Sequence, residues 1–163
     1  MRINKGEQQE DDLQLIDGVS DFSELITPCC PFSNHIIGDG GAVDITLALV
    51  HRAVEATIEV VISKVHSGFS LSLSSFVFIC GLYKEIQLFH GTIGESRCLR
   101  RFVIVVKMDT WMHLKFNISQ KGSRNDLERY CSFKANNHGY ASQQIMAHLT
   151  SISAKVTWST VPL

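Results

Sequence analysis

Histidine and cysteine are the residues of this chain best suited to chemistry, because imidazoles and thiolates bind metals and act in acid–base and nucleophilic catalysis. No two of the seven histidines stand four residues apart, as two ligands on one helix face would, and no C-x-x-C pair occurs. We therefore predict no catalytic residue, no metal site and no bound cofactor, and we interpret the histidines as solvated side chains. They are His35, His51, His66, His90, His113, His138 and His148.

The five cysteines are odd in number, so their count and spacing predict reduced thiols rather than a disulfide framework. A cytoplasmic or nuclear location fits, since the polar N-terminus has no apolar stretch typical of a signal peptide. A nucleophile at Cys29 or Cys30 would need a histidine and a carboxylate brought together by folding. We favour two small residues packed between prolines. The cysteines are Cys29, Cys30, Cys80, Cys98 and Cys131.

Four aspartates stand in expected loops, where clustered oxygen ligands can hold calcium at one end of a sandwich. They stand one per loop, without the D-x-D spacing that concentrates negative charge, so we interpret them as turn-forming residues. A calcium-dependent, membrane-binding sandwich stays an alternative that requires these carboxylates to meet. The four are Asp39, Asp44, Asp109 and Asp126.

Six basic residues would form a patch if the ends of the expected hairpins met, and Phe133 and Tyr140 would add stacking surface for nucleic acid. The formal net charge of -1 supplies no overall positive field, so we predict a solvated charged rim and no nucleic-acid partner. The six are Arg97, Arg100, Arg101, Lys107, Lys121 and Arg124.

The elements that must position these side chains are strands, because apolar and polar residues alternate with a period of two. Residues 54–62 place valine, alanine and isoleucine at one parity and Glu55, Thr57 and Glu59 at the other. The same period returns in residues 112–118 and 152–158, which predicts antiparallel sheets with one dry face. Further strands are expected at 45–49, 69–79, 84–90, 101–108, 127–135 and 140–149. The fold class is therefore all-β, an antiparallel β-sandwich of roughly eight or nine strands.

Turn residues separate these runs. The glycines around Asp39 predict a hairpin turn followed by a strand, and a kink is expected at 51–53. Residues 91–98 are expected as a connection, and residues 127–130 have room for one helical turn. We expect a mobile acidic segment at 1–12, a single sandwich domain at 13–163 and no membrane span, because serines interrupt the longest apolar run.

Three segments together resemble a known family: RAVEATIEV at 52–60, SFKANNHGYASQQI at 132–145 and KVTWSTV at 155–161. The chain is similar to a domain of unknown function, DUF6598, that is expanded in cereal grasses. The resemblance implies a plant β-sandwich without an assigned activity, so it carries no catalytic residues over. Typical members have further strands before the point where this chain begins, which implies a shortened form with an open sheet edge.

Some relatives in this family carry names of ribosome-inactivating rRNA N-glycosylases. The glycosidase helix in such proteins resembles Ser-Glu-Ala-x-Arg, whereas the nearest string here runs from Val54 to Ile58, lacks the arginine and alternates as a strand. We therefore expect a non-catalytic binding or interaction module, which pairs with a protein partner or with itself through an open sheet edge. The alternative is an accessory domain of a ribosome-inactivating protein, without the catalytic signature in this chain.

Overall fold

The computed structural model describes residues 2–3, 13–14, 31–38, 40–120 and 126–160 of the 163-residue chain. These residues form thirteen strands and no helix. The backbone divides into two compact units, Met1–His51 and Arg52–Leu163. The strands of the first unit are β1 (Arg2–Ile3), β2 (Leu13–Gln14), β3 (Phe32–Gly38) and β4 (Gly41–Leu47). Those of the second are β5 (Ala53–Ser63), β6 (Phe69–Ile79), β7 (Leu82–Ile93), β8 (Arg97–Cys98), β9 (Phe102–Lys107), β10 (Trp111–Ser119), β11 (Leu127–Lys134), β12 (Gly139–Ala147) and β13 (Thr150–Thr160).

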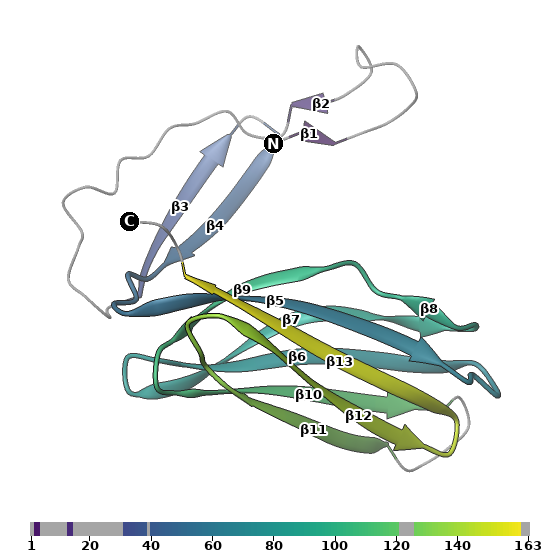
Figure 1. The fold of residues 1–163 in the computed structure, drawn as a ribbon. Coiled ribbons are helices and arrows are strands. Elements are labelled where there is room, and N and C mark those ends of the chain that lie inside the picture. Colours follow the sequence, from purple (N-terminus) through teal and green to yellow (C-terminus); the bar gives the residue numbers. More distant parts are fainter. Residues whose placement is uncertain (1, 4–12, 15–30, 39, 121–125, 161–163) are drawn as a thin grey trace. The chain divides into compact units, whose positions relative to one another are not determined.

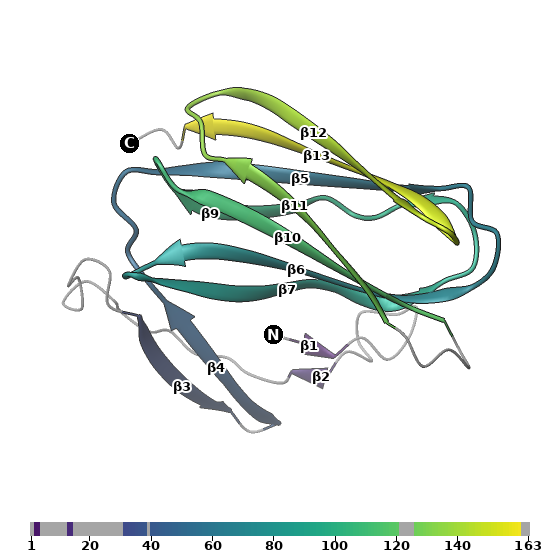
Figure 2. The same cartoon turned by 90° about the horizontal axis from the view of Figure 1, so that it is seen from below.

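The second unit is a sandwich of two antiparallel sheets (Figure 1). One sheet has four strands in the order β11-β10-β6-β7. The other has the order β12-β13-β5, and β8 and β9 both pair with the far side of β5. Figure 2 shows the two layers from a second direction. The prediction of an all-β antiparallel sandwich is confirmed.

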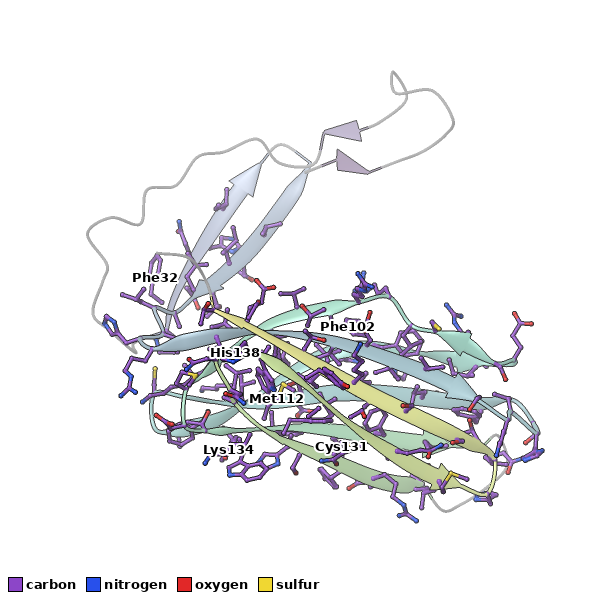
Figure 3. All side chains as sticks on the ribbon, viewed as in Figure 1. Phe32, Phe102, Met112, Cys131, Lys134 and His138 are labelled. Carbon is purple, nitrogen blue, oxygen red and sulfur yellow. The ribbon has the colours of Figure 1, made fainter. Side chains whose placement is uncertain are left out.

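The period of two in the sequence becomes the core between the two sheets. Burial alternates along β5 and β10, because successive side chains of a strand point to opposite faces. Figure 3 shows the packed side chains, among them Met112 from β10 and Phe102 from β9. Eight residues at the apolar parity of the three alternating runs are all buried: Val54, Ala56, Ile58, Val60, Leu114, Phe116, Val156 and Trp158. Trp111, the first residue of β10, is 47% exposed.

Two predictions of local structure from the sequence are wrong. Residues 91–93 belong to β7 rather than to a connection, and Ile93 is fully buried. The period is hard to see there because β7 contains a bulge: Leu73 pairs with Phe89 but Ser74 pairs with Gln87, so Leu88 is an extra residue. Residues 127–130 form the start of β11 and no helical turn, since pairing with β10 decides their conformation.

In the first unit, β1 pairs with β2, and β3 pairs with β4 in a hairpin whose last partners are Gly38 and Gly41. The strand predicted after the glycine-rich turn is therefore present as β4. Its partner β3 was not predicted, because its sequence mixes polar and apolar residues directly after Pro31. The predictions of a mobile segment at 1–12 and of one domain over 13–163 stay predictions.

Two buried serines provide a test of how the core treats polar groups. Ser75 Oγ is buried without a hydrogen-bond partner in the described part of the chain, whereas Ser151 Oγ accepts from Gln144 Nε2 at 2.8 Å. Ser75→Ala should raise the free energy of unfolding by about 1 kcal/mol, because it removes an unpaired group. Ser151→Ala should lower it by about 1 kcal/mol, because it breaks a bond. Urea unfolding of both variants measures the pair, and a loss of stability in Ser75→Ala contradicts the prediction.

Candidate functional site

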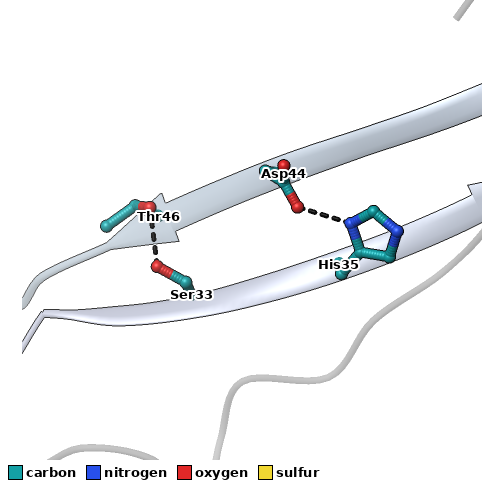
Figure 4. Close-up of polar contacts among 4 residues, drawn as sticks. All are labelled: Ser33, His35, Asp44 and Thr46. Carbon is teal, nitrogen blue, oxygen red and sulfur yellow. Dashed lines mark hydrogen bonds and ion pairs between the residues drawn. The ribbon is translucent and has the colours of Figure 1, made fainter.

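The histidines do not form a cluster among the described residues. His35 Nδ1 lies 2.5 Å from Asp44 Oδ1 across the β3–β4 hairpin, beside a Ser33–Thr46 hydroxyl pair at 2.8 Å (Figure 4). His113 on β10 is half-buried, and its Nδ1 lies 2.8 Å from Ser132 Oγ. The remaining five are exposed: His51, His66, His90, His138 and His148. In the ranges that the structure describes, no three metal-binding side chains come together.

The three described cysteines are separate from one another and form no disulfide within the described ranges. Cys131 on β11 lies in the core, and burial raises the pKa of its thiol to about 11. It therefore stays protonated at neutral pH and is a poor nucleophile. Cys98 on β8 is exposed, and Cys80 is half-buried. Cys29 and Cys30, the nucleophiles considered from the sequence, lie outside the described residues.

The aspartates do not meet at one end of a sandwich in the described chain. Asp44 lies within β4 rather than in a loop, because it faces His35 across the hairpin. Asp109 occupies the turn after β9 with a φ of 62° and forms an ion pair with Arg52 at 3.5 Å. Asp126 is exposed just before β11, and Asp39 lies outside the described residues. Turn formation thus accounts for Asp109 and not for Asp44.

The basic residues considered as a patch are partly engaged elsewhere. Arg101 Nε donates to Glu59 Oε1 at 2.7 Å, and Arg100 lies over the ring of Phe102 at 5.5 Å. Phe133 is buried and has no stacking surface to offer. Tyr140 is 72% exposed, but Lys155 Nζ lies 5.3 Å from its ring centroid. Lys121 and Arg124 lie outside the described residues.

Glu59 organises the outer face of the β12-β13-β5 sheet. Besides Arg101, Lys155 Nζ approaches it at 3.6 Å, so one carboxylate on β5 connects β13 with the residue that precedes β9. Ser142 and Ser153 are among the residues that line a hollow beside this group. On the outer face of the other sheet, the hydrogen bond from Lys115 to Glu128 raises the pKa of Lys115 and lowers that of Glu128. Both outer faces thus carry paired charges.

The edges of the two sheets are the remaining places to examine for binding, because an edge strand leaves every second N–H and C=O without a partner strand. Gln143 on β12 covers the edge of β11. Its Nε2 donates to the Ser132 carbonyl at 2.7 Å, and its Oε1 accepts from the Ser132 N–H at 3.3 Å. One side-chain amide therefore replaces a strand at this position.

The β7 edge is protected in another way. Its bulge interrupts the straight run of backbone groups, and Lys84, which is exposed, places a charge on this edge opposite Val77. Bulges and edge lysines discourage a sheet edge from pairing with another chain. The β8 end also has a bulge, since three residues lie between Cys98 and Phe102 while two lie between their partners on β5, Val61 and Ile58.

The centre of the β9 edge, residues 102–106, has none of these protections. Residues 102–106 read FVIVV, without a charge, a proline or a bulge, and β9 pairs with β5 alone among the described strands. Met108 N–H donates to Arg52 C=O at 2.7 Å, so even-numbered residues of β9 direct their backbone groups toward β5. The N–H and C=O of Val103 and Val105 consequently face away from the sheet. Their side chains lie on the outer face and are 58% and 46% exposed.

The comparison with protein families decides where this sandwich belongs. The sequence matches the family "Domain of unknown function (DUF6598)" over residues 1–156. The chain belongs to the DUF6598 family. The DUF6598 match extends over the strands of both units and ends within β13. No curated protein and no solved structure matches the chain. Among the described residues, no helix is present that would be long and apolar enough to cross a membrane.

Sequence reasoning expected an open edge without assigning it to a strand. The signal for β9 was present in the uncharged FVIVV run, but the same run also fits a central strand. Nothing in the sequence indicates Gln143 as an edge cover, because its partner is a backbone group on a strand that another turn positions. Glu59 was placed correctly on the outer face, without its two basic partners.

Gln143 provides a test of edge protection. Gln143→Ala should lower the free energy of unfolding by about 1–2 kcal/mol and increase aggregation, because it uncovers the Ser132 backbone groups. Gln143→Glu should keep the bond from the Ser132 N–H and place a carboxylate against the Ser132 carbonyl, so it should also destabilise. Urea unfolding and static light scattering measure both effects. Wild-type values in Gln143→Ala would show that the amide does not protect the edge.

The position of Glu55 leads to a prediction about ribosomal RNA. Glu55 lies on β5 between Val105 and Ser159, so it does not occupy a helix of the Glu-x-x-Arg kind. Purified protein should leave ribosomal RNA intact in an aniline-cleavage assay, and Glu55→Ala should behave identically. Cleavage that disappears in Glu55→Ala would overturn this prediction.

Proposed function

We propose that this DUF6598 protein is a non-catalytic interaction module that binds an extended segment of a polypeptide by adding it as a strand beside β9. The observation that carries the proposal is the outward direction of the Val103 and Val105 backbone groups, within a stretch, 102–106, that has no bulge, charge or proline. Main-chain donors and acceptors that have no partner among the described strands favour, in this arrangement, an extended chain over other ligands.

Addition of a strand at this edge gives modest affinity. The two valines offer two N–H and two C=O groups, and each hydrogen bond contributes about 0.5–1.5 kcal/mol net. Partial burial of the two exposed side chains adds to this, and ordering of the peptide opposes it. Binding of a short peptide is therefore expected in about the micromolar to millimolar range.

The position of β9 supports this role without a large change in the fold. β9 is held to the sandwich by six partner pairs with β5, and its Phe102, Ile104 and Val106 side chains are buried. The edge is therefore rigid before a partner arrives, which lowers the cost of ordering it. The grass origin, a defence role and the link to ribosome-inactivating proteins stay predictions from the family resemblance, and strand addition does not depend on them.

Substitutions at Val105 test the proposal. Proline at this position removes an outward-facing N–H and spares the bonds to β5, a placement that edge strands tolerate. Val105→Thr keeps the N–H and the β-branched shape, so it is the matched control. The probe is the capped neutral peptide TTVTVTT, and the measurement is residue-resolved amide exchange by NMR.

Added peptide should slow exchange of the Val103 amide in the wild type and in Val105→Thr. Val105→Pro should melt at a similar temperature and show no protection of Val103. Protection of β7 amides in place of β9, or equal protection in all three proteins, would refute the assignment of this edge.

A further inference from the structure

On the basis of the proposed function, we propose that the strand added at β9 is acidic at both ends and comes from a different protein rather than from a second copy of this chain. The inference depends on the row of side chains that share the outer face along this edge. Along the chain they are Arg101, which directly precedes β9, and Val103, Val105 and Lys107 of β9. A cation therefore stands at each end of two exposed valines.

The two cations differ in what they already contact. Arg101 has an exposed side chain, 74% accessible, and only its Nε donates to Glu59 Oε1. Its two Nη groups point to no other acceptor among the described ion pairs, and a guanidinium has donors for two carboxylates. Lys107 ends β9 and forms no ion pair in the described chain, since the nearby Asp109 is paired with Arg52. Both ends of the row are able to receive a carboxylate.

An antiparallel strand beside β9 places its residues directly opposite this row. A carboxylate would face Lys107, β-branched apolar residues would face Val105 and Val103, and a second carboxylate would face Arg101. The complementary pattern is E-x-V-x-V-x-E, with every second side chain on the outer face. Opposite charges at directly facing positions stabilise a strand pair, and like charges destabilise it.

The same rule disfavours a second copy as the occupant. Two β9 strands related by a two-fold axis at Ile104 would pair Val103 with Val105 and Arg101 with Lys107, and the last pair would occur twice. If one β9 strand is shifted by two residues relative to the other, Arg101 no longer faces Lys107. One of these two cations then faces a valine, and fewer residues of the two strands are paired. The edge is therefore protected against its own copies by its ends, while the FVIVV centre stays open.

Three capped peptides test the inference on the full chain: ETVTVTE, KTVTVTK and ETVTVTE methylated on the amide nitrogens of both valines. A fourth, methylated on the threonine nitrogens that face away from β9, is the matched backbone control. Fluorescence anisotropy should show that ETVTVTE binds about tenfold more tightly than KTVTVTK at low salt, with a smaller ratio at high salt. Valine methylation should abolish binding, and threonine methylation should spare it.

Variants of the protein complete the test. Lys107→Glu should weaken the binding of ETVTVTE about three- to tenfold and strengthen the binding of KTVTVTK, because it reverses the charge at one end of the row. Lys84→Glu on the β7 edge, which changes a lysine of another sheet edge, should change neither affinity. The comparison of peptides on the wild type remains decisive if Lys107→Glu does not fold.

The outcomes separate the inference from the function on which it rests. Equal affinity for the acidic and basic peptides, with sensitivity to valine methylation retained, would overturn the acidic partner and leave strand addition standing. Insensitivity to valine methylation would overturn both. A dimer in sedimentation velocity that the acidic peptide dissociates would show that a second copy occupies β9, and it would overturn the inference.

Discussion

The accounting of backbone hydrogen bonds at the sheet edges is the constraint on which the rest of this structure depends. Two sheets packed face to face satisfy their central strands, yet each sheet ends in strands with half of their polar groups unpaired. Three of these edges differ: the Gln143 side chain covers β11, a bulge interrupts β7, and the centre of β9 has neither device. We expect function at β9.

The two faces of the sandwich have opposite roles. Between the sheets, leucine, isoleucine, valine and phenylalanine side chains form one continuous core that packs the sheet of β5 against the sheet of β10. Outside, charges are paired across strands, as Glu59 is with Arg101 and Lys155, and Glu128 with Lys115. Paired charges on a sheet face contribute little to stability in water, but they leave few isolated charges for a ligand to recognise.

Much of the fold was predictable, because a strand with one buried face has apolar residues at every second position of its sequence. Val54 to Ile62 and Met112 to Ile118 follow it strictly, and both are central strands. The prediction of strand boundaries failed at the bulge around Leu88, where an extra residue breaks the period of two. It also failed at Leu127, where pairing with β10 decides the backbone conformation. The site was harder to predict. Only the register between β5 and β9 shows which way the Val103 backbone points, and register is a property of two distant segments.

The pairing of β5 with β13 has a consequence for how the protein is made. Residues 54–63 find their partners at 151–160, so the central strand of one sheet waits for the last described strand to leave the ribosome. Such distant pairing slows folding, since a long loop must close, at an entropic cost, before the strand pair contributes to stability. At elongation rates of about 5–20 residues per second, β5 stays without β13 for several seconds. During that time the residues of β5 that the finished sandwich buries lack one of their neighbouring strands.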